Sequence, residues 1–164
     1  MLTGGFRNTL IRQSHRVRVA CLAQIVDVIA PLVINSKGTL RQSIYYPYKM
    51  VLDYARGRML DIQVESETYP IRAAGLRADF ARDEQVPFLD VVATYDAKTK
   101  RIAVFAVNRD LVNERELALT FEDVSPSRAL ACKTATGPDV KAFNTFENPN
   151  KVVMTKLDAM KAGS

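Results

Sequence analysis

The chain has 164 residues, of which 48% are hydrophobic and 25% charged, a composition typical of a globular protein with one domain or one domain and part of another. Its net charge of +5 comes from scattered basic residues without a Lys/Arg run, so nucleic acid is not an expected partner. Two cysteines far apart and a single histidine exclude a zinc site of the usual ligand number and argue against a disulfide framework, which favours a reducing, cytoplasmic compartment.

The N-terminal segment is basic and has no acidic residue before Asp27. It superficially resembles a mitochondrial transit peptide but lacks the bias toward serine, and its apolar pattern continues into a strand-like run. We therefore interpret it as folded structure. The apolar run 17–34 is interrupted by charged and polar residues and by Pro31, so no membrane span is expected.

The first half of the chain predicts helix, strand and helix. Apolar residues at helical spacing predict a helix over residues 2–10, and alternation over Val17–Leu22 predicts a short strand. Periodicity leaves 25–29 open between strand and helix. A turn is expected at 35–38, where the sequence reads Asn-Ser-Lys-Gly.

The stretch "RQSIYYPYKM" predicts the second helix. Ser43 suits the N-cap, and Pro47 would fall in the first turn, where its missing N–H matters little. Gly57 is placed where a helix stop is expected. Between the cap and this stop, one face of the predicted helix is apolar and consists of Ile44, Tyr48, Val51, Leu52 and Ala55.

After Gly57 the apolar period falls to two, which predicts strands. They are expected at 59–64, 88–95, 101–108, 117–121, 128–134 and 151–155, with a charged connection over 76–86. Residues 96–100 should turn the hairpin between the second and third of these. Short strands at this spacing predict an antiparallel sandwich.

No set of residues with the spacing of a catalytic machinery stands out. His15 has no partner in a motif, and Glu65 and Glu67 would share a face only if their strand extended that far. Asp27 follows an apolar run and could be buried, but it stands alone. The residues therefore predict no catalytic residue, no metal site and no cofactor.

Gln42 is the one candidate site residue. If Val17–Leu22 is a barrel strand and Ser43 begins the next helix, Gln42 lies in a strand-to-helix connection, and such connections form the active-site face of a (β/α)₈ barrel. Its amide both donates and accepts hydrogen bonds, which suits a sugar hydroxyl. The alternative is a surface glutamine before a helix cap.

Long ordered motifs carry a family resemblance. "FRNTLIRQSHRVRVACLAQIVDVIAPLVI", "GTLRQSIYYPYKM", "YARG", "PFLDVVATYD", "IAVFAVNRDL" and "DVKAFNTFENPNKVV" resemble the C-terminal part of the family 51 α-L-arabinofuranosidases. The resemblance runs from about Leu2 to Val153. Asp27 stands where the family commonly has asparagine, and the end of the chain diverges after Val153.

The resemblance implies a mixed α and β fold. Residues 1–57 would form the last elements of a (β/α)₈ barrel, and residues 58–164 an antiparallel β-sandwich, mostly β and truncated. The chain would then be a fragment cut at both ends, a homo-oligomer when intact, and bound to no membrane.

The resemblance also implies retaining hydrolysis of terminal α-L-arabinofuranosyl groups from arabinan- or arabinoxylan-type glycans. Both family glutamates, the acid/base and the nucleophile, precede the matched region, so the chain alone is expected to be inactive. Gln42 matches the glutamine of the family's R-Q-[ST] motif and would contact an arabinose-containing oligosaccharide in the intact enzyme. The alternative from another class is a non-catalytic β-sandwich binding or interaction module, which the absence of Trp disfavours.

Overall fold

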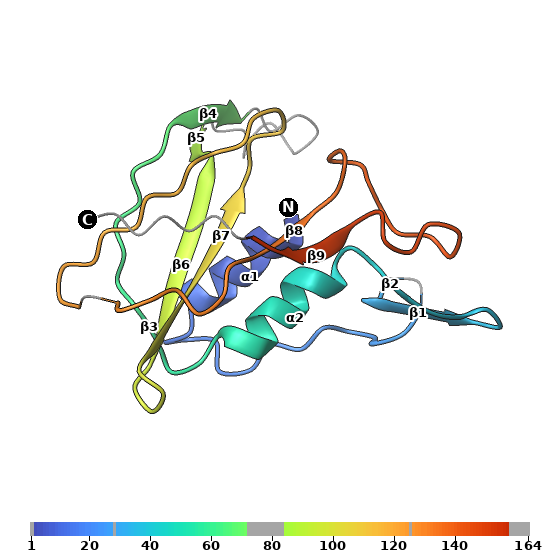
Figure 1. Cartoon of the computed structure of the whole chain (residues 1–164), viewed down its shortest axis with the longest axis horizontal. Helices are drawn as coiled ribbons and strands as arrows, with labels where there is room; N and C mark the ends of the chain where they lie inside the picture. The colour runs from blue at the N-terminus through green and yellow to red at the C-terminus, as the bar shows by residue number, and fades with distance from the viewer. Residues whose placement is uncertain (1, 28, 72–83, 125, 158–164) are drawn as a thin grey trace, which may run out of the picture. The chain divides into compact units, whose positions relative to one another are not determined.

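The computed structural model describes residues 2–27, 29–71, 84–124 and 126–157. Within them, two helices accompany one three-stranded and three two-stranded sheets, and every pairing between these strands is antiparallel (Figure 1). Contacts divide the chain into two compact units that alternate along the sequence. The first holds the residues up to Arg18 and from Tyr54 to Arg115, and the second holds Val19–Asp53 and the residues from Glu116 onward.

The first unit is built on the sheet β3-β6-β7, made of Arg58–Met59, Leu89–Asp96 and Arg101–Asn108. The hairpin of β6 and β7 confirms the predicted one. Its turn is fixed by Asp96, whose carboxylate accepts from the backbone N–H of Lys98 at 3.0 Å and from the Thr99 hydroxyl at 2.8 Å. The middle of β6 is buried at every position from Asp90 to Thr94, which places the core of this unit there.

Helix α1, Leu2–Arg12, packs on β6 and β7 and confirms the predicted first helix. A Cβ at Gly4 would lie 2.8 Å from Cγ2 of Val107, so the helix approaches the sheet closely at this glycine. The Asn8 amide, almost fully buried, donates to the Asp90 carbonyl at 2.9 Å. Helix and sheet are thus joined by both packing and a buried hydrogen bond.

A second hairpin in this unit pairs β4, Thr68–Ile71, with β5, Glu84–Pro87. The expected connection over 76–86 lies outside the described residues up to position 83, and its residues 84–86 are wrongly predicted, because they belong to strand β5. Arg115 forms ion pairs with Glu67 and Asp110, and its guanidinium lies 4.2 Å from the centre of the Phe88 ring.

The second unit contains the hairpin of β1, Leu32–Asn35, and β2, Gly38–Arg41, followed by helix α2, Tyr45–Tyr54. The predicted turn at 35–38 and the predicted second helix are confirmed, with Pro47 in the first turn. Further along, β8, Lys133–Thr136, pairs with β9, Val153–Lys156. Strand β9 overlaps most of the predicted 151–155, whereas β8 shares only residues 133–134 with the predicted 128–134.

The predicted strand over Val17–Leu22 is wrong. The N–H of Val17 still donates to the Gln13 carbonyl at 2.8 Å, so the chain is turning where the strand was expected to start. Alternation describes only side chains, whereas a strand requires a neighbouring backbone to hydrogen-bond with. The barrel portion expected in residues 1–57 is therefore not present: the described residues there form a helix, a hairpin and a helix.

Two further strand predictions are wrong in whole or in part. The expected strand at 59–64 ends after Met59, although the N–H of Leu60 still donates to the Ala93 carbonyl. Residues 117–121 alternate in polarity but lie outside every strand, with their side chains exposed. The sandwich itself stays a prediction.

Candidate functional site

Gln42 lies in the connection between strand β2 and helix α2. Its backbone N–H donates to the Pro31 carbonyl at 2.9 Å, and its carbonyl accepts from the N–H of Tyr45 at 2.9 Å, where α2 begins. The predicted strand-to-helix connection is therefore present, but β2 supplies the strand in place of Val17–Leu22. Hydrogen bonds on both sides hold the backbone of this residue.

The side chain of Gln42 is half-buried and also held. Its Nε2 donates to the carbonyl of Ala30 at 2.7 Å, and Ala30 is fully buried. That bond uses one of the two N–H groups of the amide and fixes its plane, and with it the direction of the side-chain carbonyl. A fixed amide is suited to orient a hydroxyl-bearing ligand.

Aromatic and cationic groups lie next to this connection. The Arg41 guanidinium carbon is 5.5 Å from the centre of the Tyr45 ring, within the range of a cation–π contact. Tyr45 in turn meets Tyr46 edge to face, with ring centres 5.5 Å apart. Tyr46 is buried, so it anchors the start of α2.

Asn144 is a buried residue at this site that the sequence did not single out. Its Nδ2 donates to the Arg41 carbonyl at 2.9 Å, directly before Gln42. The surrounding "NTFENPN" belongs to one of the motifs that carry the family resemblance, but nothing local in it predicts a contact 103 residues away.

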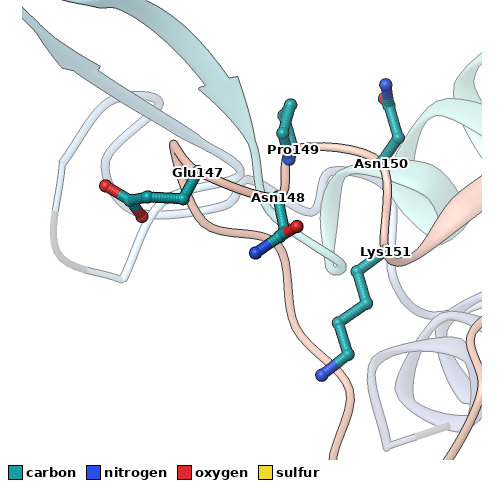
Figure 2. A pocket seen from close by; sticks show the side chains of 5 residues that line it. All are labelled: Glu147, Asn148, Pro149, Asn150 and Lys151. Carbon is teal, nitrogen blue, oxygen red and sulfur yellow. The ribbon is translucent and has the colours of Figure 1, made fainter.

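An open hollow in the same unit is lined by residues 147–151. Figure 2 shows their side chains pointing apart: Glu147 extends to one side, Pro149 and Asn150 point one way, and Lys151 points the other. Glu147 and Lys37, both exposed, approach to 3.7 Å. Because these groups do not converge, the loop offers no site for a compact ligand.

In the first unit two arginines surround the carboxylate of Asp90. Its side chain is 3% exposed, and its two oxygens meet Arg12 at 2.6 Å and Arg109 at 2.8 Å. A small hollow of about 120 Å³ lies beside Arg12, lined otherwise by residues 59–62 and Val92. Each oxygen of Asp90 forms an ion pair with an arginine, and these two partners compensate its negative charge. A carboxylate held in this way is a poor nucleophile.

The two aspartates whose pKa is shifted do not have the properties of a general acid. Hydrogen bonds from the Thr99 hydroxyl and the Lys98 backbone lower the pKa of Asp96. The backbone N–H groups of Val112 and Asn113 lower the pKa of Asp110 well below its usual range. A general acid in glycoside hydrolysis requires the opposite direction.

The other candidates are surface groups. His15 is exposed, and Glu67 is exposed and paired with Arg115. Asp27, which could have been buried, is exposed in a tight turn with φ of 79°. Within the described residues no cluster of His, Cys, Asp or Glu could hold a metal ion. No helix among them is long and apolar enough to cross a membrane.

Known proteins similar to this chain share one description. The family model of the alpha-L-arabinofuranosidase C-terminal domain matches residues 1–164. The chain is 31% identical over 156 residues to the intracellular exo-alpha-(1->5)-L-arabinofuranosidase of Streptomyces lividans, covering 94% of this chain and 22% of that protein. It is 32% identical to the intracellular exo-alpha-(1->5)-L-arabinofuranosidase 1 of Bacillus subtilis, covering 93% of this chain and 29% of that protein.

Solved structures of alpha-L-arabinofuranosidases are also similar to this chain. The arabinose complex of the Thermotoga maritima alpha-L-arabinofuranosidase matches with a TM-score of 0.76 and 28% identity, covering 94% of this chain and 32% of that one. A family 51 alpha-L-arabinofuranosidase from Bifidobacterium longum matches with a TM-score of 0.72 and 30% identity, covering 96% and 30%. The chain thus spans less than a third of the length of these relatives. The resemblance seen in the sequence is confirmed, and the chain belongs to the family of alpha-L-arabinofuranosidase C-terminal domains.

Proposed function

We propose that this chain serves as the C-terminal part of a cytoplasmic exo-acting α-L-arabinofuranosidase that removes terminal α-L-arabinofuranosyl groups from arabinan- or arabinoxylan-type glycans. The names of the Streptomyces and Bacillus relatives support the activity and its intracellular setting. In the longer, homo-oligomeric enzyme the antiparallel sheets would belong to a β-sandwich. The two catalytic carboxylates of a retaining mechanism would lie outside these residues.

The observation that carries this proposal is the fixed amide of Gln42. Its backbone and its side chain are held by the carbonyls of Pro31 and Ala30, so it can meet a ligand without losing side-chain freedom at that moment. Its role would be to hydrogen-bond a hydroxyl of the arabinosyl group and hold that sugar for attack by the nucleophile. This chain would bind and orient, and it would transfer no proton.

The direct test replaces the matched segment of the Bacillus subtilis enzyme with this chain. The chimaera is expected to hydrolyse an aryl α-L-arabinofuranoside, whereas the chain alone is expected to show negligible turnover. Robust turnover by the isolated chain, or an inactive but folded chimaera, would contradict the proposal. Tight binding of arabinoxylan oligosaccharides by the isolated chain would instead favour a binding module.

The role of Gln42 is tested in the same chimaera. Gln42→Ala removes one neutral hydrogen bond to the sugar and is expected to raise KM, lowering kcat/KM about fivefold to tenfold. Gln63→Ala, which truncates an exposed glutamine elsewhere, is the matched control and should leave both constants unchanged. Equal kinetics for the two variants would exclude Gln42 from the site.

A further inference from the structure

Asn144 uses its whole side-chain amide in hydrogen bonds. Its Nδ2 donates to the Arg41 carbonyl and to the Val152 carbonyl, each at 2.9 Å, and its Oδ1 accepts from the N–H of Val152 at 2.7 Å. The residue is 6% exposed. A buried amide with both donors and its acceptor engaged can occupy only one orientation.

The two bonds to Val152 give this amide a rigid base. They engage both the N–H and the carbonyl of one residue, as a neighbouring strand would, immediately before β9. Val152 is itself buried, and a Cβ at Gly137 would lie only 2.9 Å from its Cγ2. Asn144 is therefore held from the β8–β9 side, and its bond to Arg41 is the one that reaches β2.

That bond reaches one particular peptide group. The carbonyl of Arg41 and the N–H of Gln42 belong to the same planar peptide unit. Asn144 donates to the carbonyl, and the N–H donates to the Pro31 carbonyl at 2.9 Å. With both polar groups of the plane held, the direction in which the Gln42 side chain leaves the backbone is also set.

We propose that Asn144 is a positioning residue for Gln42: it fixes the Arg41–Gln42 peptide plane and thereby aims the Gln42 amide at the arabinosyl group. The aim at a sugar rests on the proposed function, whereas the control of the peptide plane does not. Loss of the Asn144 side chain frees the Arg41 carbonyl and lets this plane rotate.

Amide hydrogen exchange in the chain itself tests the control of the plane. In Asn144→Ala the N–H of Gln42 is expected to exchange at least about tenfold faster, while amides at the far end of the hairpin, such as the N–H of Gly38, change much less. Asn8→Ala is the matched control, because it removes another buried amide that donates to a backbone carbonyl, in the other unit. It should leave the Gln42 N–H unchanged.

A second variant keeps the test decisive if Asn144→Ala does not fold. Asn144→Asp retains the oxygen that accepts from the N–H of Val152 but cannot donate to Arg41 when ionised. We expect the Val152 N–H to stay protected and the Gln42 N–H to exchange faster. Uniform acceleration across the second unit in both variants would show a merely structural role and overturn the proposal.

Kinetics in the chimaera separate this inference from the proposed function. Asn144→Ala is expected to raise KM, and the double variant with Gln42→Ala should be no worse than Gln42→Ala alone, because both act through one contact. Additive effects would overturn the positioning role. If Gln42→Ala has no effect on KM while the exchange result holds, the sugar contact fails and the peptide-plane control stands.

Discussion

At the scale of single residues, Gly57, which follows helix α2, occupies a backbone position that only glycine fits without strain and a clash. Its φ is +79°, and a Cβ there would lie 1.9 Å from the Tyr95 carbonyl oxygen. Gly57→Ala is expected to lower the free energy of unfolding by at least about 2 kcal/mol, since backbone strain and a clash with main chain add together. Urea denaturation of both proteins measures the loss.

Gly38→Ala is the control for strain alone. This glycine has φ of +129°, and no atom lies within 4 Å of the position its Cβ would take. The expected loss is smaller than for Gly57→Ala, because only the conformational term remains. Equal losses in the two variants would show that the contact with Tyr95 relaxes freely.

The Asp110 carboxylate predicts sensitivity to acid. It accepts from the N–H of Val112 at 3.0 Å, from the N–H of Asn113 at 3.1 Å and from Nε of Arg115 at 2.8 Å, and its pKa is lowered from the ordinary 3.8. A lowered native pKa gives stability that is present above the unfolded value and is lost as pH falls toward the native one.

The corresponding measurement compares unfolding at pH 6 and pH 3. The parent chain is expected to lose more stability over this interval than Asp110→Asn, which no longer titrates at this position. If the parent chain and Asp110→Asn lose the same stability between pH 6 and pH 3, the Asp110 carboxylate is not a source of the acid sensitivity.

At the scale of elements, two adjacent glycines in α1 make opposite predictions. Gly5→Ala is expected to stabilise the chain by about 0.5–1 kcal/mol through helix propensity, because its Cβ would make only ordinary contacts, the nearest 3.5 Å from Asp90. Gly4→Ala gains the same propensity but meets Val107 at 2.8 Å, so its net effect should be clearly less favourable. Thermal unfolding ranks the two.

Removing the contact between position 4 and Val107 tests the prediction for Gly4→Ala. In a Val107→Ala background the methyl groups facing the helix are gone, and Gly4→Ala should then behave like Gly5→Ala. Two glycine variants of equal stability in the parent chain would mean that α1 does not dock through Gly4.

At the scale of the whole molecule, the chain is similar to one part of longer relatives. Its described residues form two compact units from segments that alternate along the sequence, so each unit needs chain from both halves. The matched part is less than a third of the length of each of these relatives. Activity would belong to the longer protein, and the contribution proposed here is one oriented amide at a sugar site.

Elements with strong local signals could be predicted from the amino-acid sequence alone. Apolar spacing located α1 and α2, and the hairpin of β6 and β7 followed from two alternating runs around a turn that Asp96 closes through its own neighbours. The long motifs were sufficient to recognise the family, and one of them contains Gln42. These features depend on residues close together in the chain, which is why they could be read from it.

The pairing of backbone segments and the surroundings of Gln42 depend on contacts between distant parts of the chain, and these became known from the fold. Alternation at Val17–Leu22 and at 117–121 produced no strand, because neither segment has a neighbouring strand to bond with. The strand before Gln42 is β2, and its last carbonyl is held by Asn144 from 103 residues away. Hydrogen bonds between distant segments leave no periodic trace in sequence, so this part of the site had to come from the fold.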